Sequence, residues 1–424
     1  APNAFPVRFK DGELAGRDGL NNPYNMLTQR GWKKTTGNTL RANLTINQDF
    51  SFITPGLSAK VSYAYDAVNY SVEERARNIN FFEATGRDQD GELIRTEWQA
   101  DQKQEYLNYK QSGNGSRTQY VEAAINYSRT FGEKHEVGGL LLGFAKDYRL
   151  QEATSDYLKS LPNRSLGLAG RLTYAYDKRY LIEANIGFNG SENFAPKNRY
   201  GFFPSVGLGW VISNEPFFRG ATEVIQYLKL RGTWGRVGNS QISGRRFAYL
   251  ATVKDTNDTS YQFGKNMDQT YGTTAIDEYA VDVTWEIADK TNIGLDMRLL
   301  NNKFNLQFDA FKESRKGIYL RRTSIPSYFG MINNPYGNIG KVENKGIEMS
   351  VSYANSWRDW SLSVMGNYSF NRNKVLEDDS TVAYPWQKTI GNKVDQRFGL
   401  IALGLFESPE EIAAAPVQVG DTRP

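Results

Sequence analysis

The chain has 424 residues, a formal net charge of +4 and no cysteine. The charges are nearly balanced and dispersed, which argues against a nucleic-acid partner. The absence of cysteine excludes disulfides, thiolate zinc sites and cysteine nucleophiles. No run of about 18 apolar residues occurs, so a transmembrane helix is excluded. A mean hydropathy of −0.58 is compatible with a soluble protein, but also with a β-barrel whose inner face is polar.

The first part of the chain is expected to be an irregular lead-in loop over residues 1–38. Prolines and glycines at positions 2, 6, 12, 16, 19 and 23 interrupt any regular pattern there. Strict alternation begins at Leu40, where Leu40, Ala42, Leu44 and Ile46 point one way and the residues between them are polar.

The clearest alternation lies after Asn301-Asn302. Apolar Phe304, Leu306 and Phe308 alternate with polar Asn305 and Asp309, so this segment predicts a strand with one apolar and one polar face. Similar patterns predict strands at 40–46, 59–66, 121–127, 137–148, 172–176, 182–188, 200–212, 227–234, 293–299, 304–319, 347–353, 360–370 and 394–406, with less regular pairs over 245–264. We count about fifteen crossings by this pattern.

The connections between these strands are of two kinds. Short turns are predicted at 54–56, 131–135, 177–179, 301–302 and 355–359, and they alternate with long polar links at 71–117, 151–163, 189–199, 323–343 and 373–393. A sheet with tight turns at one end and long loops at the other is typical of outer-membrane barrels. Residues 39–424 are therefore predicted to be all-β, an antiparallel transmembrane β-barrel wall with those long links as extracellular loops.

A soluble β-sandwich is the structural alternative, because its strands also alternate and also form hairpins. The strand lengths and the number of charges on the polar face favour the barrel. These charges are Arg41, Lys60, Asp66, Glu122, Glu183, Asp296, Arg298, Asp309 and Glu348. Tyrosine and tryptophan near the strand ends, such as Tyr65, Tyr176 and Trp360, are what an interfacial girdle requires.

Several segments carry a family likeness. The stretch from Leu161 to Phe218 resembles the barrel of the SusC/RagA-like TonB-dependent transporters of the Bacteroidetes outer membrane, and so does LKLRGTWGRVGNSQI from Leu228. The same resemblance covers Trp285–Tyr319, Asn338–Tyr353 and Asn367–Val375. It implies a wide barrel plugged by an N-terminal domain, a TonB box, a SusD-like surface lipoprotein as a lid, outer-membrane lipid around the wall, and oligosaccharides or peptides as substrates.

The sequence departs from that family pattern at both ends. We find no plug-domain stretch and no TonB box before Leu40, no signal peptide at Ala1, and no further strands after Pro424. About fifteen strands compare with the ~22 of plugged transporters. The chain is thus expected to be a partial barrel wall, about 15 strands of a larger plugged barrel, that depends on missing strands for closure.

Neither catalysis nor a cofactor is expected. His135, the single histidine, falls in a predicted tight turn, which leaves no Ser-His-Asp arrangement. Asp88, Asp90 and Glu92 around Gly91 lack the spacing of a calcium loop and predict a hairpin turn instead. Aromatic residues in the long links are the candidate contacts for a substrate or a lid, because flat rings stack on sugars and partner surfaces; packing of the loops against each other is an equal alternative. They are Trp98, Tyr106, Tyr109, Tyr328, Phe329, Tyr336, Tyr384 and Trp386.

The leading hypothesis is a segment of an energised outer-membrane importer, without enzymatic activity. The alternatives are a passive porin-like channel and a soluble β-rich cell-surface binding module.

Overall fold

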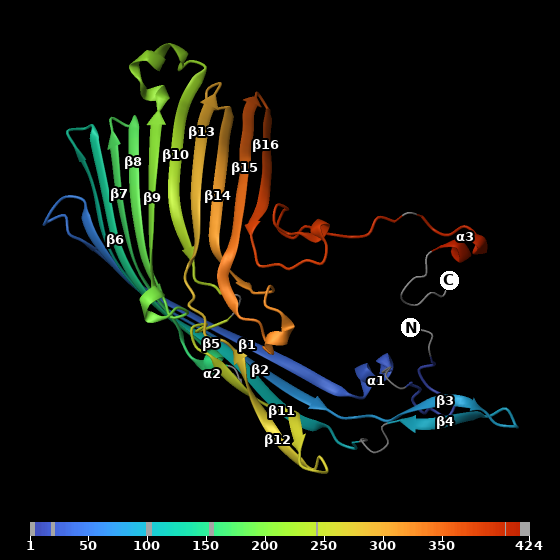
Figure 1. The fold of residues 1–424 in the computed structure, drawn as a ribbon. Helices are drawn as coiled ribbons and strands as arrows, with labels where there is room; N and C mark the ends of the chain where they lie inside the picture. The colour runs from blue at the N-terminus through green and yellow to red at the C-terminus, as the bar shows by residue number, and fades with distance from the viewer. Residues whose placement is uncertain are drawn as a thin grey trace.

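The computed structural model describes residues 5–17, 22–98, 104–151, 157–242, 245–402 and 404–415. Most of them form one twelve-stranded antiparallel sheet (Figure 1), in the order β1-β2-β5-β6-β7-β8-β9-β10-β13-β14-β15-β16. The strands are β1 (Gly31–Asp49), β2 (Leu57–Ala76), β5 (Asn108–Phe131), β6 (His135–Gln151), β7 (Asn163–Tyr176), β8 (Tyr180–Ser191), β9 (Tyr200–Val211), β10 (Ile225–Asn239), β13 (Glu286–Leu299), β14 (Phe304–Arg321), β15 (Tyr336–Trp357) and β16 (Trp360–Glu377).

The remaining elements lie beside the sheet. Two separate hairpins are β3 (Phe81–Arg87) with β4 (Leu93–Trp98), and β11 (Thr252–Phe263) with β12 (Gln269–Glu278). Short helices are α1 (Pro23–Thr28), α2 (Tyr157–Ser160), α3 (Pro409–Ala414) and the 3-10 turns η2 (Pro196–Asn198), η3 (Ile212–Asn214), η4 (Pro216–Ala221), η5 (Ser327–Phe329) and η6 (Pro385–Gln387). Of the helices in the described residues, none has the length and apolar character needed to cross a membrane.

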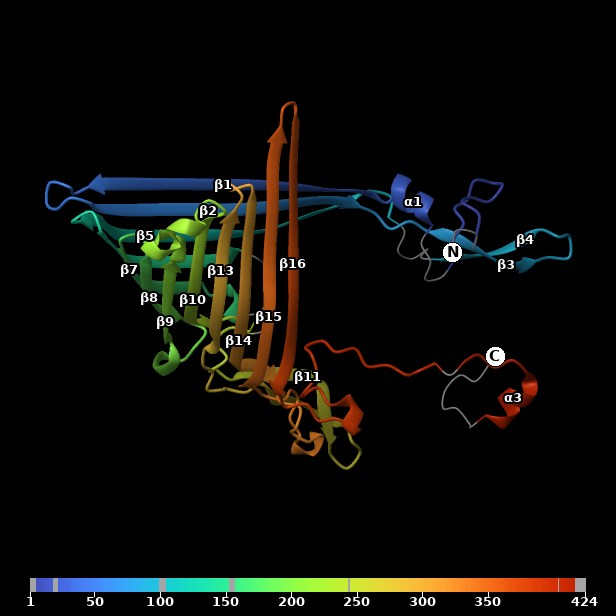
Figure 2. The same cartoon turned by 90° about the horizontal axis from the view of Figure 1, so that it is seen from above.

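The sheet is a single curved layer. Seen from above, the strands change direction progressively from β1 and β2 to β15 and β16 (Figure 2), as the natural twist of a sheet requires. β1 and β16 each have one neighbour in the sheet. A β-sandwich needs two stacked layers, so this arrangement excludes the sandwich alternative.

Burial along the strands is inverted relative to a soluble protein. In β8 the apolar side chains of Ile182, Ile186 and Phe188 are exposed, whereas Glu183 and Asn185 between them are half-buried. The polar side chains are less exposed because they contact one another on their face of the sheet, as Arg171, Asn185 and Glu183 do. Within the described residues no second sheet covers the apolar face, as expected for a surface that meets lipid.

The register extends this apolar face across the sheet. Ile182 lies opposite Leu208, Leu230 opposite Leu295, and Leu295 opposite Phe308, so that the apolar positions of successive strands coincide. We call the exposed members of this face the apolar belt. It comprises Leu44, Ile46, Val61, Val121, Ile125, Leu141, Leu168, Leu172, Ile182, Ile186, Phe188, Phe202, Leu208, Leu230, Ile293, Ile347, Met349, Val364 and Phe370.

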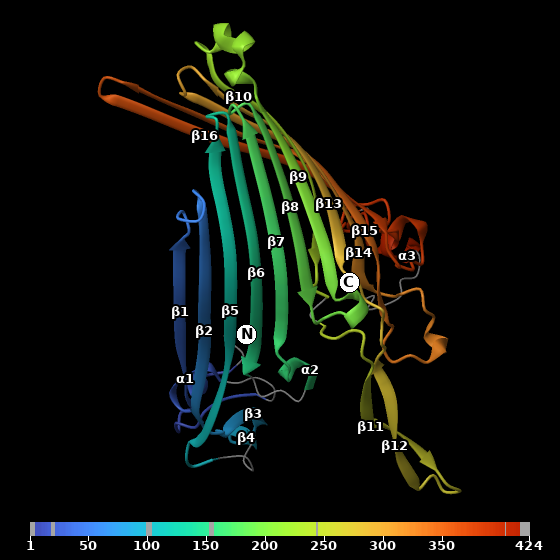
Figure 3. The same ribbon diagram turned by 90° about the vertical axis from the view of Figure 1, so that its left-hand side faces the viewer.

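The two ends of the sheet differ as predicted. Tight turns join β1 to β2, β5 to β6, β7 to β8, β13 to β14 and β15 to β16, while the hairpins β3–β4 and β11–β12 extend from the opposite end (Figure 3). In the first turn Gly56 has a φ of 87°, and a Cβ there would lie 1.9 Å from the Ser128 carbonyl oxygen, so glycine is required. The β9–β10 connection is longer and carries η3 and η4.

The sheet has fewer strands than the roughly fifteen counted from the pattern. Of the pairs expected over 245–264 the structure has one strand, β11, which pairs with β12 beyond that range in a hairpin outside the sheet. Residues 394–402 and 404–406, part of the predicted last strand, have no strand structure. Alternation alone does not make residues 394–402 and 404–406 a strand, because no described strand pairs with them.

Strand bounds also differ from the sequence pattern. β1 begins at Gly31, so the expected boundary between 1–38 and 39–424 falls inside this strand. β2 and β5 both extend into the 71–117 link, and β15 begins at Tyr336 within the 323–343 link. These strand ends are polar or glycine-rich on both faces, so no alternation reveals them; pairing with the neighbouring strand keeps them extended.

A small buried core lies among the connections at the long-loop end. It consists of Phe194, Ile242, Ala248, Val283 and Tyr319, from four segments of the chain. Trp285 packs against it with its ring 5.1 Å from that of Phe194. This core holds the bases of the long loops together, and so it positions the loops.

Candidate functional site

The charges predicted for the polar face do share one face of the sheet. Arg41 lies opposite Asp66, and Asp309 opposite Glu348, on the side facing away from the apolar belt. At the β2–β5 pair the Lys60 Nζ lies 2.9 Å from Glu122 Oε1, and the Tyr120 hydroxyl donates to Glu122 at 2.7 Å. This face is therefore lined by paired charges that also offer hydrogen-bonding groups to water or a polar solute.

On the polar face, Arg231 of β10 contacts carboxylates of both β13 and β14. Its Nη2 donates to Asp309 Oδ2 at 2.7 Å, and its Nε lies 3.3 Å from Asp296 Oδ2. Asn292 donates to the second Asp309 oxygen at 2.9 Å. Gly294 leaves the room for this guanidinium, because a Cβ there would lie 2.4 Å from Arg231 Cζ. Sequence reasoning did not single out Arg231, although its alternation with Leu230 and Gly232 places it on the polar face.

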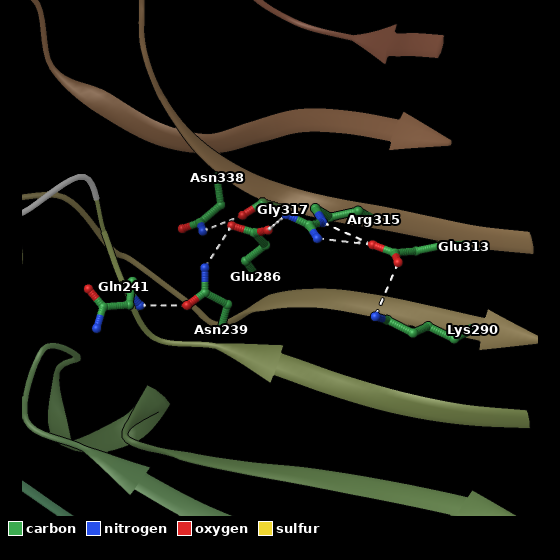
Figure 4. A network of polar contacts seen from close by, with 8 residues as sticks. All are labelled: Asn239, Gln241, Glu286, Lys290, Glu313, Arg315, Gly317 and Asn338. Atoms are coloured by element: carbon green, nitrogen blue, oxygen red, sulfur yellow. Dashed lines mark hydrogen bonds and ion pairs between the residues drawn. The ribbon is translucent and has the colours of Figure 1, made fainter. Parts of the chain in front are cut away.

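A second polar network lies on the same face near the long-loop end (Figure 4). Arg315 bridges two carboxylates, Glu286 Oε1 at 3.2 Å and Glu313 Oε1 at 3.0 Å, and Lys290 Nζ lies 3.2 Å from Glu313 Oε2. Asn239 donates to Glu286 at 3.4 Å. These contacts cross β10, β13 and β14, so they fix the lateral order of the strands as well as lining the polar face.

A hollow of about 480 Å³ opens near the short-turn end. Small residues, among them Gly138, Gly207 and Gly209, contribute to its lining, and the longer side chains around it include Glu183 and Lys229. Glycine at these positions leaves space above the backbone, and charged side chains of neighbouring strands line that space.

The single histidine and the acidic residues around Gly91 both lie in or beside tight turns. His135 is the first residue of β6 after the tight turn, and its Nδ1 lies 2.8 Å from the Tyr174 hydroxyl. Asp88 closes the turn between β3 and β4, accepting the backbone N–H groups of Asp90 and Glu92 at 3.0 and 2.8 Å, so the predicted hairpin turn is confirmed. Among the described residues no three His, Asp or Glu side chains converge as a metal site would.

Four of the eight candidate aromatic residues form two exposed stacks. The rings of Tyr384 and Trp386 are 4.6 Å apart and nearly parallel, at 7°. Those of Tyr328 and Phe329 are 5.4 Å apart at 22°. Tyr328 is 83% exposed and Trp386 70%, so both stacks present a flat apolar surface to solvent.

Asp379 ties together the two loops that carry these stacks. Its carboxylate accepts hydrogen bonds from the Thr323 and Ser324 backbone N–H groups at 3.0 and 3.2 Å and from the Ser324 hydroxyl. Burial raises the pKa of Asp379, but the hydrogen bonds from Ser324 and Thr323 outweigh it and hold this pKa below its ordinary value. The base of the 322–335 loop is thereby joined to the segment after β16.

The other four candidates are divided between surface and interior. Tyr106 and Tyr109 are exposed, and the Arg75 guanidinium lies 5.0 Å from the centre of the Tyr109 ring. Trp98 is half-buried, opposite Phe81 at the base of the β3–β4 hairpin. Tyr336 stacks on Tyr319 at 5.0 Å and belongs to the edge of the loop-end core.

These features define a class of protein. The described sheet is a single antiparallel wall. Its strands have at least 12 residues, which is longer than the ~9–11 residues that a membrane-spanning strand needs. With its apolar belt on one face and paired charges on the other, it is a partial wall of a transmembrane β-barrel.

Comparison with known proteins identifies the family. Residues 2–403 match the family model described as TonB dependent receptor-like, beta-barrel, and the chain belongs to this family. TonB-dependent receptor P39 of Formosa agariphila is 29% identical over 70% of this chain and 30% of its own length. TonB-dependent receptor SusC of Bacteroides thetaiotaomicron is 31% identical over 55% of this chain and 23% of its own length.

The fold resembles a solved transporter as well. The RagAB peptide importer in its closed-closed state superposes with a TM-score of 0.63 at 18% identity, covering 90% of this chain and 42% of that one. The expected SusC/RagA-like resemblance is thus confirmed at the level of the barrel. The chain spans between a fifth and a third of the curated relatives it matches.

Proposed function

We propose that this chain is part of the barrel wall of a TonB-dependent importer in the outer membrane of a Bacteroidetes-like Gram-negative bacterium. The observation that supports it most strongly is the inverted burial, with the apolar belt outward and the Arg231 network on the opposite face. Such a wall divides lipid from a watery interior. A solute would pass through this interior without covalent chemistry, so the protein would act as a transporter and not as an enzyme.

The wall needs further partners to work. β1 and β16 each present an unpaired edge within the described sheet, and an unpaired backbone group in lipid costs several kcal/mol. Additional strands of the longer protein would pair with both edges. The residues before β1 would lead into the wall, and a plug domain with a TonB box would couple the barrel to the energy source.

The loop aromatics are the proposed contacts with substrate or lid. The stacks Tyr384–Trp386 and Tyr328–Phe329 are exposed on loops held together by Asp379, a geometry suited to a sugar ring, a peptide side chain or a SusD-like surface lipoprotein. Tyr106 and Tyr109 would contact substrate or lid near the β1 edge of the sheet. Trp98 and Tyr336 would pack beneath the loops and support them. Oligosaccharides or peptides are the proposed substrates, in line with the name of the RagAB peptide importer.

The first test separates active import from passive diffusion. Cells that express the full-length protein are given fluorescently labelled starch oligosaccharides and, separately, labelled casein peptides, with and without a protonophore. Uptake of at least one probe should depend on the protein and be abolished by the protonophore. Uptake that persists without the proton gradient would instead indicate a passive porin-like channel.

The second test concerns the aromatic stacks. We expect the double variant Tyr384→Ala/Trp386→Ala to lower the affinity for the imported probe about tenfold. The reason is that stacking on an aromatic ring is worth ~0.5–1.5 kcal/mol per pair, and the variant removes two rings. Trp360→Ala is the matched control, since Trp360 is 80% exposed but lies at the short-turn end. Equal affinities for both variants would remove the stacks from the site.

A further inference from the structure

A second hollow lies on the outer face of the wall, the face that carries the apolar belt. Its volume is about 360 Å³, and its lining includes Tyr63, Val121, Ala145, Leu166 and Tyr200. The register pairs Tyr63 with Val121, Val121 with Ala145, and Ala145 with Leu166, so these side chains share the outer face of four adjacent strands. The hollow is six strands wide, from β2 to β9, and neither edge strand of the described sheet, β1 or β16, lines it.

Gly190 lets an aromatic ring lie close to the sheet at one side of this hollow. Gly190 lies opposite Leu166 on one side and Tyr200 on the other. A Cβ on Gly190 would lie 2.7 Å from the Tyr200 ring. That ring stacks on Phe188 at 5.2 Å and 5°. The Tyr200 ring therefore lies over Gly190 as one wall of a shallow apolar slot that runs towards Tyr63.

Basic groups gather at the long-loop end of the slot, still on the outer face. Arg149 and Arg164 each place Nε 2.9 Å from a different oxygen of Asp147. Their side chains remain 43% and 54% exposed, whereas Asp147 is 22% exposed. Both guanidinium groups therefore share a single carboxylate and still face the exterior.

Two further arginines add positive charge around this cluster. Arg117 lies directly opposite Arg149 in the β5–β6 register, an arrangement in which like charges destabilise a sheet unless an anion lies between them. Arg199 also lines the hollow, and its Nε is buried without a hydrogen-bond partner among the described residues. Glu192 is the second carboxylate of the lining, which leaves the cluster with an excess of arginine.

The position of the cluster selects the ligand. It lies where the apolar belt ends and the long loops begin, which on the proposed orientation is the headgroup level of the outer leaflet. Arginine forks bind phosphate through paired hydrogen bonds, and basic pockets beside an apolar wall bind anionic lipid headgroups. A soluble anion would use the arginines but would leave the apolar slot empty.

We infer that this hollow binds a phosphorylated lipid of the outer leaflet, with its phosphate on the exposed guanidinium groups of Arg149 and Arg164 that Asp147 holds side by side, and an acyl chain along Tyr63, Val121 and Leu166. The inference rests on the proposed outer-membrane placement, and it adds a specific lipid site to the wall. Its role is to fix the wall to the outer leaflet next to the 152–162 connection.

The test uses the purified full-length protein in detergent, with lipid A as the probe. We expect lipid A to bind the unmodified protein, and Arg149→Ala/Arg164→Ala to weaken this binding at least tenfold. Arg236→Ala/Lys316→Ala is the matched control, because it also removes two cations that share one carboxylate, Asp289, elsewhere on the same outer rim. This control should bind lipid A as the unmodified protein does.

Two further arms separate the lipid from a free anion. Inorganic phosphate should not displace lipid A, and Ala145→Leu, which fills the slot but keeps the arginines, should also weaken lipid A binding. Displacement by phosphate, unchanged binding in the arginine or slot variants, or an equal loss in the control would overturn the inference. Protonophore-sensitive uptake is measured on the same variants, so that loss of the lipid site and failure of the import proposal are read separately.

Discussion

Glu215 shows how a single buried carboxylate fixes a connection. It lies between η3 and η4 and is 5% exposed. The Trp210 indole N–H donates to Glu215 Oε1 at 3.0 Å, and Arg179 Nη1 lies 2.9 Å from Oε2. The hydrogen bonds from Trp210 and Tyr180, with the Arg179 charge, hold the pKa of Glu215 below its ordinary value. The β9–β10 connection is thereby attached to the β7–β8 turn.

A pH dependence follows from the direction of this pKa. Because the pKa of Glu215 is lower in the folded protein than the ~4.3 of an unfolded chain, its stabilisation is complete above about pH 4.3 and is lost as the pH falls through the folded value. Hydrogen exchange of the amides in 212–224 should therefore accelerate in acid. Glu215→Gln should accelerate it already at neutral pH, where the charge would otherwise be present.

Glu223→Gln is the control for this measurement, because Glu223 is an exposed carboxylate of the same connection. Hydrogen exchange of the 212–224 amides in this variant should be as slow as in the unmodified protein at every pH. If Glu215→Gln left the neutral-pH exchange unchanged, the buried contacts of Glu215 would not be what holds the connection.

At the scale of elements, the loop-end core is the counterpart of a soluble protein's interior. Phe194 comes from the β8–β9 connection, Ala248 and Val283 flank the β11–β12 hairpin, and Tyr319 lies near the end of β14. The strands need no such core, since their backbone hydrogen bonds and lipid contacts suffice. The connections do need it, because they are long and carry the aromatic stacks.

Phe194→Ala should therefore destabilise the protein more than any exposed aromatic replacement. Phe194 is fully buried, and truncating a buried phenylalanine costs ~3–5 kcal/mol. Urea unfolding of the detergent-solubilised full-length protein, followed by tryptophan fluorescence, measures this change. Phe217→Ala, at a position 71% exposed, should change the free energy of unfolding by less than ~0.5 kcal/mol; similar losses for the two would count against the core.

Predictability from the sequence varied among the elements for a physical reason. The strand from Phe304 was evident because its apolar and polar faces meet different surroundings, and that difference imposes a period of two. β11 lies within the less regular pairs predicted over 245–264, whereas β12 lies beyond them and was not predicted, and neither was the place of this hairpin outside the sheet. A hairpin outside the sheet needs no apolar face, so its residues carry no strict alternation from which the strand ends and their pairing could be predicted.

On the scale of the whole molecule, the decisive property is the orientation of the two faces. Ile186→Arg places a charge in the apolar belt, where arginine costs ~2–4 kcal/mol at the membrane midplane. We expect this variant to lower the amount of folded full-length protein recovered in the outer-membrane fraction. Asn185→Arg, one residue away on the polar face, is the control and should be recovered normally; the opposite order would mean that the faces are reversed.

The sequence by itself determined that the chain is a one-layer β wall with unlike faces and unlike ends, because side-chain alternation and link length depend only on local order. It also placed the eight aromatic candidates in or beside the long links. Only the tertiary structure decided which of them stack in the open and which pack beneath, and that Arg231, Asp296 and Asp309 share one network. Those outcomes depend on which strands are neighbours, and register between segments up to 78 residues apart is set by pairing of the backbone and not by any single stretch of sequence.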